Sequence, residues 1–175
     1  MHTTKPEATE FAPYYDKYTS RVPDGDIITI LRDQLAETTA LLRSIPEEQG
    51  EMRYAEGKWT IKELIGHIID GERVFAYRAL RFARGDATPL PGFDQDVFMS
   101  SAPFANVTLA ELTAELTSVR ESTIFLFAHL DDEAWSRRGV ASDNEVTVRA
   151  LAHMIAGHEL HHRAILQSHY LSAVN

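Results

Sequence analysis

Two histidines on a predicted helix near the C-terminus have the clearest capacity for chemistry. His158 and His162 are four residues apart, so they lie one turn from each other on the same helix face. Two neutral imidazoles at this spacing can share a metal ion, with bonds of about 2.0–2.1 Å. The face is a seam where a bundle helix normally carries Leu or Ile, and it consists of Leu151, Ile155, His158, His162, Ile165 and His169. Because a buried polar group without partners costs roughly 1–3 kcal/mol, the pair favours a metal site over two core histidines.

His67 is the predicted third ligand, on a helix that the sequence predicts over 61–83. It lies on the inward face of this helix, between Leu64 and Gly71. Gly66 and Gly71 flank it, and a glycine inside a helix costs about 1 kcal/mol relative to alanine. That cost is explained if a neighbouring backbone, a metal or a ligand must come close at this point.

Three histidine ligands leave one coordination position open, as in catalytic rather than structural sites. A water bound there would have its pKa lowered towards about 7 and become a nucleophile, or the position could accept a substrate thiolate. Groups next to the ligands should orient the imidazole rings. Glu63, one turn before His67, is a candidate, although it also matches a capping box with Thr60, and Asp70 and Glu159 are further candidates.

Two metal-site motifs overlap the C-terminal histidines. Residues 158–162 read H-E-x-x-H, as in zinc proteases, but only 13 residues follow and no sheet is predicted to hold a substrate. Glu159 and His162 also match the E-x-x-H of di-iron bundles. That site needs a second copy, and the position three before His67 is Leu64. The sequence therefore favours a mononuclear site.

Four segments with helical periodicity must position these residues. They cover approximately 26–44, 61–83, 109–130 and 148–168. Thr60 with Glu63 and Thr108 with Glu111 are capping boxes, and Thr147 is the expected cap of the last helix. No segment alternates for long enough to predict a strand. The sequence predicts an all-α protein, a four-helix bundle.

Two segments lie outside these helices. The connection over 84–107 is longer than bundle connections usually are, so it is either a functional lid or a crossover between helices. Its aromatic residues, Phe93, Phe98 and Phe104, can pack it onto the bundle. Residues 1–22 form a predicted N-terminal arm, which lies on the bundle or against a second subunit, and 23–175 form the bundle domain.

The charge and the absence of cysteine exclude some classes of partner and some kinds of chemistry. The 175 residues carry a formal net charge of −9, which argues against nucleic acid and anionic membranes as partners. With no cysteine, the chain has no disulfide, and any thiol must come from outside. Residues 1–10 lack the apolar run of a signal peptide, and no stretch approaches the roughly 20 apolar residues of a membrane span, so we expect a cytoplasmic protein.

Three segments resemble the DinB-like superfamily, also called the DinB/YfiT-like metalloenzymes. They are G-K-W-T-I-K-E-L-I-G-H at 57–67, L-P-G-F-D-Q-D at 90–96 and G-H-E-L-H-H-R at 157–163, and the resemblance extends from about 26 to 171. It implies a four-helix bundle with a long crossover between helices 2 and 3. It also implies one divalent metal ion, zinc, nickel, iron or manganese, on three histidines. Carried over by position, these are His67, His158 and His162.

The resemblance implies several activities. Some relatives are low-molecular-weight-thiol S-transferases, some are mycothiol-dependent isomerases, and many are described as metal-dependent hydrolases. It also implies a small-molecule substrate and a homodimer. The alternatives are a non-catalytic metal- or small-molecule-binding module in the stress response, and a structural bundle whose histidines belong to the core.

Overall fold

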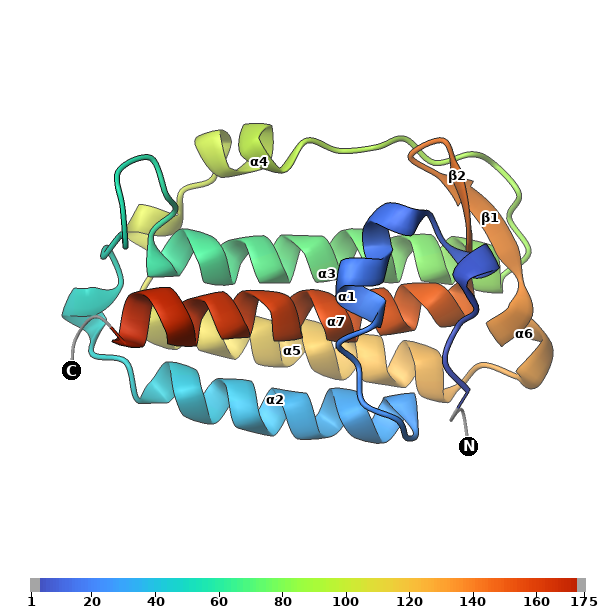
Figure 1. Cartoon of the computed structure of the whole chain (residues 1–175), viewed down its shortest axis with the longest axis horizontal. Helices are drawn as coiled ribbons and strands as arrows, with labels where there is room; N and C mark the ends of the chain where they lie inside the picture. Colours follow the sequence, from blue (N-terminus) through green and yellow to red (C-terminus); the bar gives the residue numbers. More distant parts are fainter. Residues whose placement is uncertain (1–3, 173–175) are drawn as a thin grey trace.

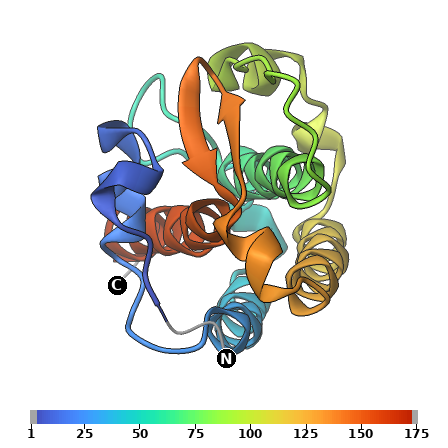
Figure 2. The same cartoon turned by 90° about the vertical axis from the view of Figure 1, so that its right-hand side faces the viewer.

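Four long helices pack as a bundle in the computed structural model, which describes residues 4–172 (Figure 1). They are α2 (Ile27–Arg43), α3 (Ile61–Ala83), α5 (Leu109–Ala128) and α7 (Val148–Ile165). Figure 2 looks along the bundle and shows α7 and α5 diagonally opposite each other. Each of these two helices packs on both α2 and α3. The predicted four-helix bundle is confirmed, and each predicted helix ends within a few residues of its expected position.

The order of the helices explains the long connection after α3. In Figure 1, α3 and α5 run in the same direction, whereas α2 and α7 run in the opposite one. Because α3 and α5 are parallel, the chain between them must return along the whole bundle. This crossover carries α4 (Gln95–Ser101) and a 3₁₀ turn over Phe104–Asn106. The predicted crossover is therefore present.

Side-chain caps set where three bundle helices begin. Thr60 accepts the Glu63 N–H at 3.0 Å, and the Glu63 carboxylate accepts the Thr60 N–H at 2.7 Å. Thr108 and Glu111 form the same reciprocal pair at 2.8 and 3.1 Å. Thr147 accepts a backbone N–H of the first turn of α7 at 3.0 Å. Each cap satisfies donors that a helix N-terminus otherwise leaves unpaired, so the capping motifs fixed these boundaries.

A short hairpin lies between α5 and α7, where the sequence predicted no strand. Strands β1 (Arg138–Ala141) and β2 (Asn144–Thr147) pair antiparallel after a short helix, α6 (Asp132–Ser136). Four residues per strand are too few for a clear alternation of apolar and polar side chains. The Leu90 N–H donates to the Val140 carbonyl at 2.9 Å, so the hairpin also holds the start of the crossover.

The core has two apolar halves with a polar layer between them. One half lies towards the hairpin and includes Leu31, Phe75, Phe82, Phe127 and Leu151. The other lies at the opposite end and includes Leu64, Ile65, Leu112, Leu116 and Leu166. Buried polar residues from all four helices occupy the middle, and they include Thr38, His67, Glu72, Arg120, His158, Glu159 and His162. The sequence-predicted ligands belong to this layer.

The N-terminal arm lies on the bundle, which is one of the two expected positions. It contains two 3₁₀ turns, Ala8–Glu10 and Pro13–Tyr15, and α1 (Asp16–Thr19), which packs on α7 (Figures 1 and 2). The backbone of α1 comes so close to α7 that a Cβ on Gly157 would lie 2.1 Å from the Tyr18 carbonyl oxygen. The division into an arm and a domain at residue 22 stays a prediction. Within 4–172, no helix is long and apolar enough to cross a bilayer.

The aromatic residues of the crossover behave differently from one another. Phe104 is buried against α3, where a Cβ on Gly66 would lie 2.3 Å from its ring. Phe98 is 39% exposed, so only part of the expected packing occurs. Phe93 is half-buried and lies 5.1 Å from Phe98 between ring centroids. The crossover is thus anchored at Phe104 and at the hairpin.

Candidate metal centre

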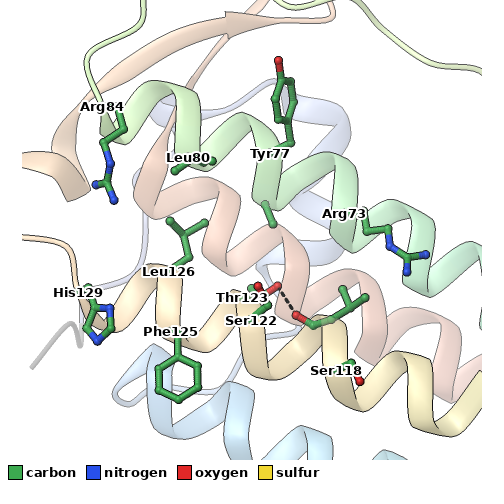
Figure 3. Close-up of a pocket in the computed structure, with 12 residues that line it drawn as sticks. Arg73, Tyr77, Leu80, Arg84, Ser118, Ser122, Thr123, Phe125, Leu126 and His129 are labelled. Atoms are coloured by element: carbon green, nitrogen blue, oxygen red, sulfur yellow. Dashed lines mark hydrogen bonds between the residues drawn. The ribbon is translucent and has the colours of Figure 1, made fainter.

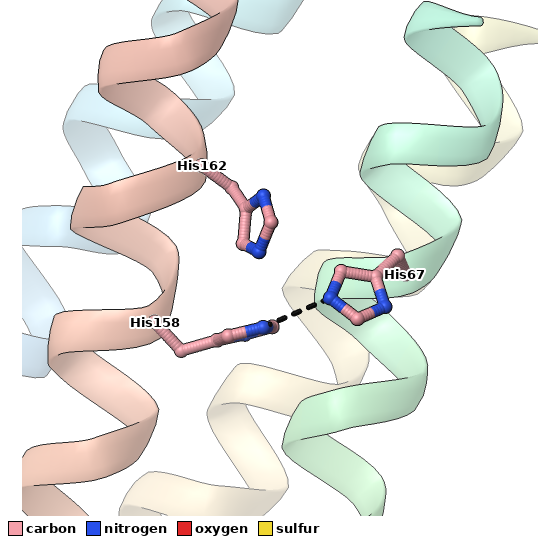
Figure 4. A group of neighbouring side chains, drawn as sticks. All are labelled: His67, His158 and His162. Carbon is pink, nitrogen blue, oxygen red and sulfur yellow. Dashed lines mark hydrogen bonds between the residues drawn. The ribbon is translucent and has the colours of Figure 1, made fainter. Parts of the chain in front are cut away.

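The three predicted histidine ligands converge in the middle of the bundle. His67 projects from α3, while His158 and His162 project from α7 towards it (Figure 4). One ring nitrogen from each lies within 4.8 Å of the others. The Nε2 atoms of His67 and His158 are 3.0 Å apart. The structure therefore brings together all three residues that the sequence singled out.

A glycine on α3 makes this convergence possible. A Cβ on Gly71 would lie 2.9 Å from Cε1 and 3.3 Å from Nδ1 of the His158 ring. Only a residue without a side chain lets the imidazole of α7 approach the backbone of α3 this closely. The close approach expected from the sequence is therefore present, and the approaching group is a side chain of the cluster itself.

The donor atoms fit a divalent metal ion. The imidazoles of His67, His158 and His162 are buried, with 3%, 5% and 8% of their surface exposed. Neither ring nitrogen of His162 has a hydrogen-bond partner within 4–172. A buried polar atom usually has a partner, and a metal ion would supply one to the His162 nitrogen that faces the cluster. An ion with bonds of about 2.0–2.1 Å holds neighbouring nitrogens roughly 3.3 Å apart, which requires only a small rearrangement of the cluster.

Burial keeps all three imidazoles neutral near pH 7. It lowers the pKa of His67 to about 4 and, with a contribution from His67, that of His162 to about 3. Burial also holds the pKa of His158 well below the ordinary value, and the two neighbouring histidines add to this. Neutral imidazole is the form that binds metal, so the free cluster is prepared for an ion.

We expect the metal-free protein to lose stability as the pH falls from about 6.5 towards 4. Below about pH 6.5 the unfolded chain protonates these histidines, whereas the folded chain does not until the pH approaches the lowered pKa of His67. The unfolded state then binds more protons, so the free energy of unfolding decreases. Urea unfolding of chelator-treated protein at several pH values measures the effect. His162→Asn should reduce the slope in this window, and an equal slope in the variant would contradict the assignment.

The carboxylates of Glu63 and Glu159 have partners other than the three histidines. The Glu63 carboxylate caps its own helix and pairs with Arg53 at 2.9 Å. Glu159 pairs with Arg120 at 2.5 Å and accepts a hydrogen bond from Thr38. Within 4–172 neither carboxylate is hydrogen-bonded to any of the three imidazoles, and their role in orienting the rings stays a prediction. Glu159 is thus engaged in the core, which disfavours the zinc-protease interpretation.

Arg120 is a central residue of the polar layer that the sequence analysis missed. Its guanidinium, 1% exposed, donates to both Glu72 oxygens at 2.8–3.1 Å and to the Leu31 carbonyl at 3.3 Å. Because it also pairs with Glu159, it joins α3 and α7, the two helices that carry the histidines. A signal was present in the sequence, since Arg120 lies four residues after Leu116 on the apolar stripe of its helix.

Cavities reach the histidine cluster from two sides. One, of about 330 Å³, contacts His67 and His158, and the other, of about 280 Å³, contacts His162. Asp94 lines the first and Asp96 the second, so the start of α4 lies beside both. The crossover segment therefore borders the site, as a lid would. A larger groove of about 650 Å³ between α3 and α5 contains none of the three histidines (Figure 3).

The other histidines within 4–172 do not join the cluster. His153 is buried, and its Nδ1 lies 3.0 Å from the Arg149 carbonyl oxygen. His161 faces the Tyr18 ring at 5.3 Å. His169 is exposed and lies against Tyr54 at 5.0 Å. Of the three seam histidines, His158 and His162 therefore converge with His67, whereas His169, further along the seam, does not.

Known proteins share both the sequence pattern and the fold. A protein of Oceanobacillus iheyensis, provisionally named as a metal-dependent hydrolase, is 30% identical over 134 residues, 75% of each chain. YfiT from Bacillus subtilis, described as a probable metal-dependent hydrolase with an unusual four-helix bundle topology, superposes with a TM-score of 0.71 at 17% identity. That match covers 97% of this chain and 90% of YfiT.

The structure of a mycothiol-dependent maleylpyruvate isomerase also superposes, with a TM-score of 0.65 at 15% identity over 78% of this chain and 58% of the isomerase. At such identities the structural matches establish a shared fold only. The sequence match establishes the family as well as the fold. The model of the DinB superfamily covers residues 30–166, a range that contains all three converging histidines. The chain belongs to the DinB superfamily.

Proposed function

We propose that this chain is a mononuclear metalloenzyme in which His67, His158 and His162 hold one divalent ion. The observation that carries the proposal is the convergence of three buried imidazoles, two of them from one helix face, with the ring nitrogens of His162 lacking any other partner within 4–172. When bound, the ion supplies Lewis-acid chemistry that lowers the pKa of a coordinated water or thiol. Imidazole ligands suit zinc, nickel and iron, and manganese is the remaining candidate.

The chain's own residues account for how such a site would work. The three imidazoles orient the ion, and their burial excludes bulk water from the core side. Two cavities give access to the cluster from different directions, so two reactants could meet there. This arrangement suits either reaction, and we place a low-molecular-weight-thiol S-transferase ahead of a metal-dependent hydrolase on the family resemblance alone. Because the chain has no cysteine, the thiol would be a diffusible one.

The names of relatives support both reaction types. The Oceanobacillus iheyensis relative is named as a hydrolase, whereas the isomerase with the same fold depends on mycothiol. We therefore keep the hydrolase as the second candidate. The homodimer, the cytoplasmic location and a role in the stress response stay predictions.

The two reaction types are separated by one screen on zinc- or nickel-loaded protein. We expect consumption of electrophilic substrates only when a low-molecular-weight thiol such as bacillithiol or mycothiol is present, and only when metal is bound. Hydrolysis of esters or amides without thiol would instead establish the hydrolase. His158→Ala serves as the control that lacks a ligand. A protein that binds metal and shows neither activity would be the non-catalytic binding module.

A further inference from the structure

We infer that the N-terminal arm determines substrate specificity, and that the cavity beside His67 and His158 receives an aromatic group of the substrate. This inference rests on the proposed metal site and goes further by naming the chemistry that the neighbouring cavity recognises. The part of the arm concerned is residues 13–19, which contains the second 3₁₀ turn and α1.

Half of the residues that line this cavity are tyrosine or phenylalanine, and they come from three separate segments. It has a volume of about 330 Å³, within the range of small-molecule sites. Its aromatic lining residues are Tyr14, Tyr15 and Tyr18 from the arm, Phe75 from α3 and Phe93 from the crossover. His67 and His158 also line it. A substrate atom at the metal therefore extends directly into aromatic surroundings.

Within the cavity, the rings of Tyr18 and Phe75 stand edge-to-face to His158, and Tyr15 does so to Phe75. Tyr18 lies 5.2 Å from the His158 ring with an angle of 86° between the planes. Phe75 lies 5.9 Å from the same ring at 84°, and Tyr15 lies 6.2 Å from Phe75 at 83°. Aromatic pairs prefer such contacts, which are worth about 0.5–1.5 kcal/mol beyond the area they bury. A further ring from a substrate could extend the same arrangement.

Both walls of the cavity are held in place by the fold. On the arm side, the close contact between Gly157 and the Tyr18 backbone fixes α1 against α7, one residue before His158. On the crossover side, Arg78 donates to the Pro91 carbonyl at 2.9 Å, and its guanidinium lies 5.8 Å from the Phe93 ring. Since walls that are already ordered lose little entropy on binding, the cavity suits a specific ligand group.

Charged groups near the cavity are already engaged. The Lys17 ammonium lies over the rings of Tyr14 and Tyr18, at 3.7 and 4.8 Å from their centroids. Asp94 accepts backbone N–H bonds at 2.8 and 3.3 Å from the first turn of α4. The remaining lining is aromatic, apart from Gly71 and Gln95. The cavity therefore favours an uncharged aromatic group.

The arm contributes to the cavity from outside the region that matches the family. The superfamily model covers residues 30–166, so the three tyrosines precede the matched region, whereas all three histidines lie within it. The cavity thus combines residues inside the match, Phe75 and Phe93, with the three tyrosines of the arm, which lie outside it.

Hydroxamates test this inference, because they combine a metal-chelating head with a variable side group. We expect benzohydroxamate to bind the zinc-loaded full-length chain at least about tenfold more tightly than acetohydroxamate, measured by calorimetry. Cyclohexanecarbohydroxamate has a ring of the same size that is not planar, and its affinity should lie between those of the other two hydroxamates. Equal affinities for benzohydroxamate and acetohydroxamate would overturn the aromatic cavity but leave the metal site intact. A chain that binds neither zinc nor any hydroxamate would overturn the proposed function and this inference together.

Two variants then test whether residues of this cavity cause the preference for the aromatic hydroxamate. Tyr18→Leu and Phe93→Ala should each reduce the ratio of the two affinities by about threefold to tenfold. Tyr77→Ala, which removes a tyrosine that is 51% exposed on α3 outside this cavity, should preserve the ratio. If the buried Tyr18 proves necessary for folding, the half-buried Phe93 still tests whether the aromatic cavity binds the ring of the hydroxamate. A ratio unchanged in Phe93→Ala would contradict the inference.

Discussion

Replacing His158 or His162 with alanine is expected to abolish stoichiometric binding of a divalent ion, and replacing His67 should do the same. Each substitution leaves two imidazoles of a site that offers three, and no carboxylate within 4–172 is hydrogen-bonded to the cluster to take the lost position. Elemental analysis of protein purified without a His tag and reconstituted with zinc measures the result. The unsubstituted chain should hold about one ion, and the variants close to none.

His153→Ala is the matched control for this experiment. His153 lies on the same helix and is buried to the same degree, at 1% exposed, but its Nδ1 already lies 3.0 Å from the Arg149 carbonyl. The variant should therefore keep about one ion per chain. A loss of metal in His153→Ala, or no metal in the unsubstituted chain after reconstitution, would refute the assignment of ligands. Far-ultraviolet circular dichroism on each variant separates loss of the site from loss of the fold.

The helices and the cluster could be predicted because local sequence rules determine them. Capping by Thr60 and Thr108 fixes where two helices begin, and the four-residue spacing places His158 and His162 on one face whatever the rest of the chain does. The glycine opposite the cluster was informative for the same reason, since a mid-helix glycine is unfavourable unless something comes close. In the structure the His158 ring lies there.

The surroundings of the cluster could not be predicted, because they depend on contacts between residues far apart in the sequence. Glu159 is adjacent to His158, yet it turns into the core towards Arg120 and Thr38 on two other helices. No periodicity in a single segment specifies that pairing. The position of Tyr18 likewise depends on how the arm crosses α7 at Gly157, about 140 residues later in the chain. The hairpin escaped detection because its strands are short.

The polar layer links the metal site to the stability of the whole bundle. Arg120 is the cation between Glu72 and Glu159, whose side chains are 2% and 1% exposed. Glu72 follows Gly71 on α3, and Glu159 follows His158 on α7. One guanidinium on α5 therefore fixes the separation of the two helices whose histidines must converge. Its loss should affect both the free energy of unfolding and the geometry of the ligands.

Arg120→Met is accordingly expected to destabilise the protein by about 3–5 kcal/mol, because it leaves two buried carboxylates without their cation. Urea unfolding measures the change. Adding Glu72→Gln and Glu159→Gln to the variant should restore part of the stability, since the unpaired charges are then removed. Arg73→Met is the matched control: Arg73 also pairs with a glutamate, Glu115, at 2.7 Å, but its side chain is 48% exposed.

The control variant should lose less than about 1 kcal/mol, as exposed ion pairs do. Equal losses in Arg120→Met and Arg73→Met would show that the buried network contributes no more than a surface pair. Zinc titration of Arg120→Met adds a second readout. If Arg120 holds α3 and α7 at the separation that the imidazoles need, zinc affinity should fall even under conditions where the variant remains folded. Unchanged zinc affinity would confine the role of Arg120 to stability.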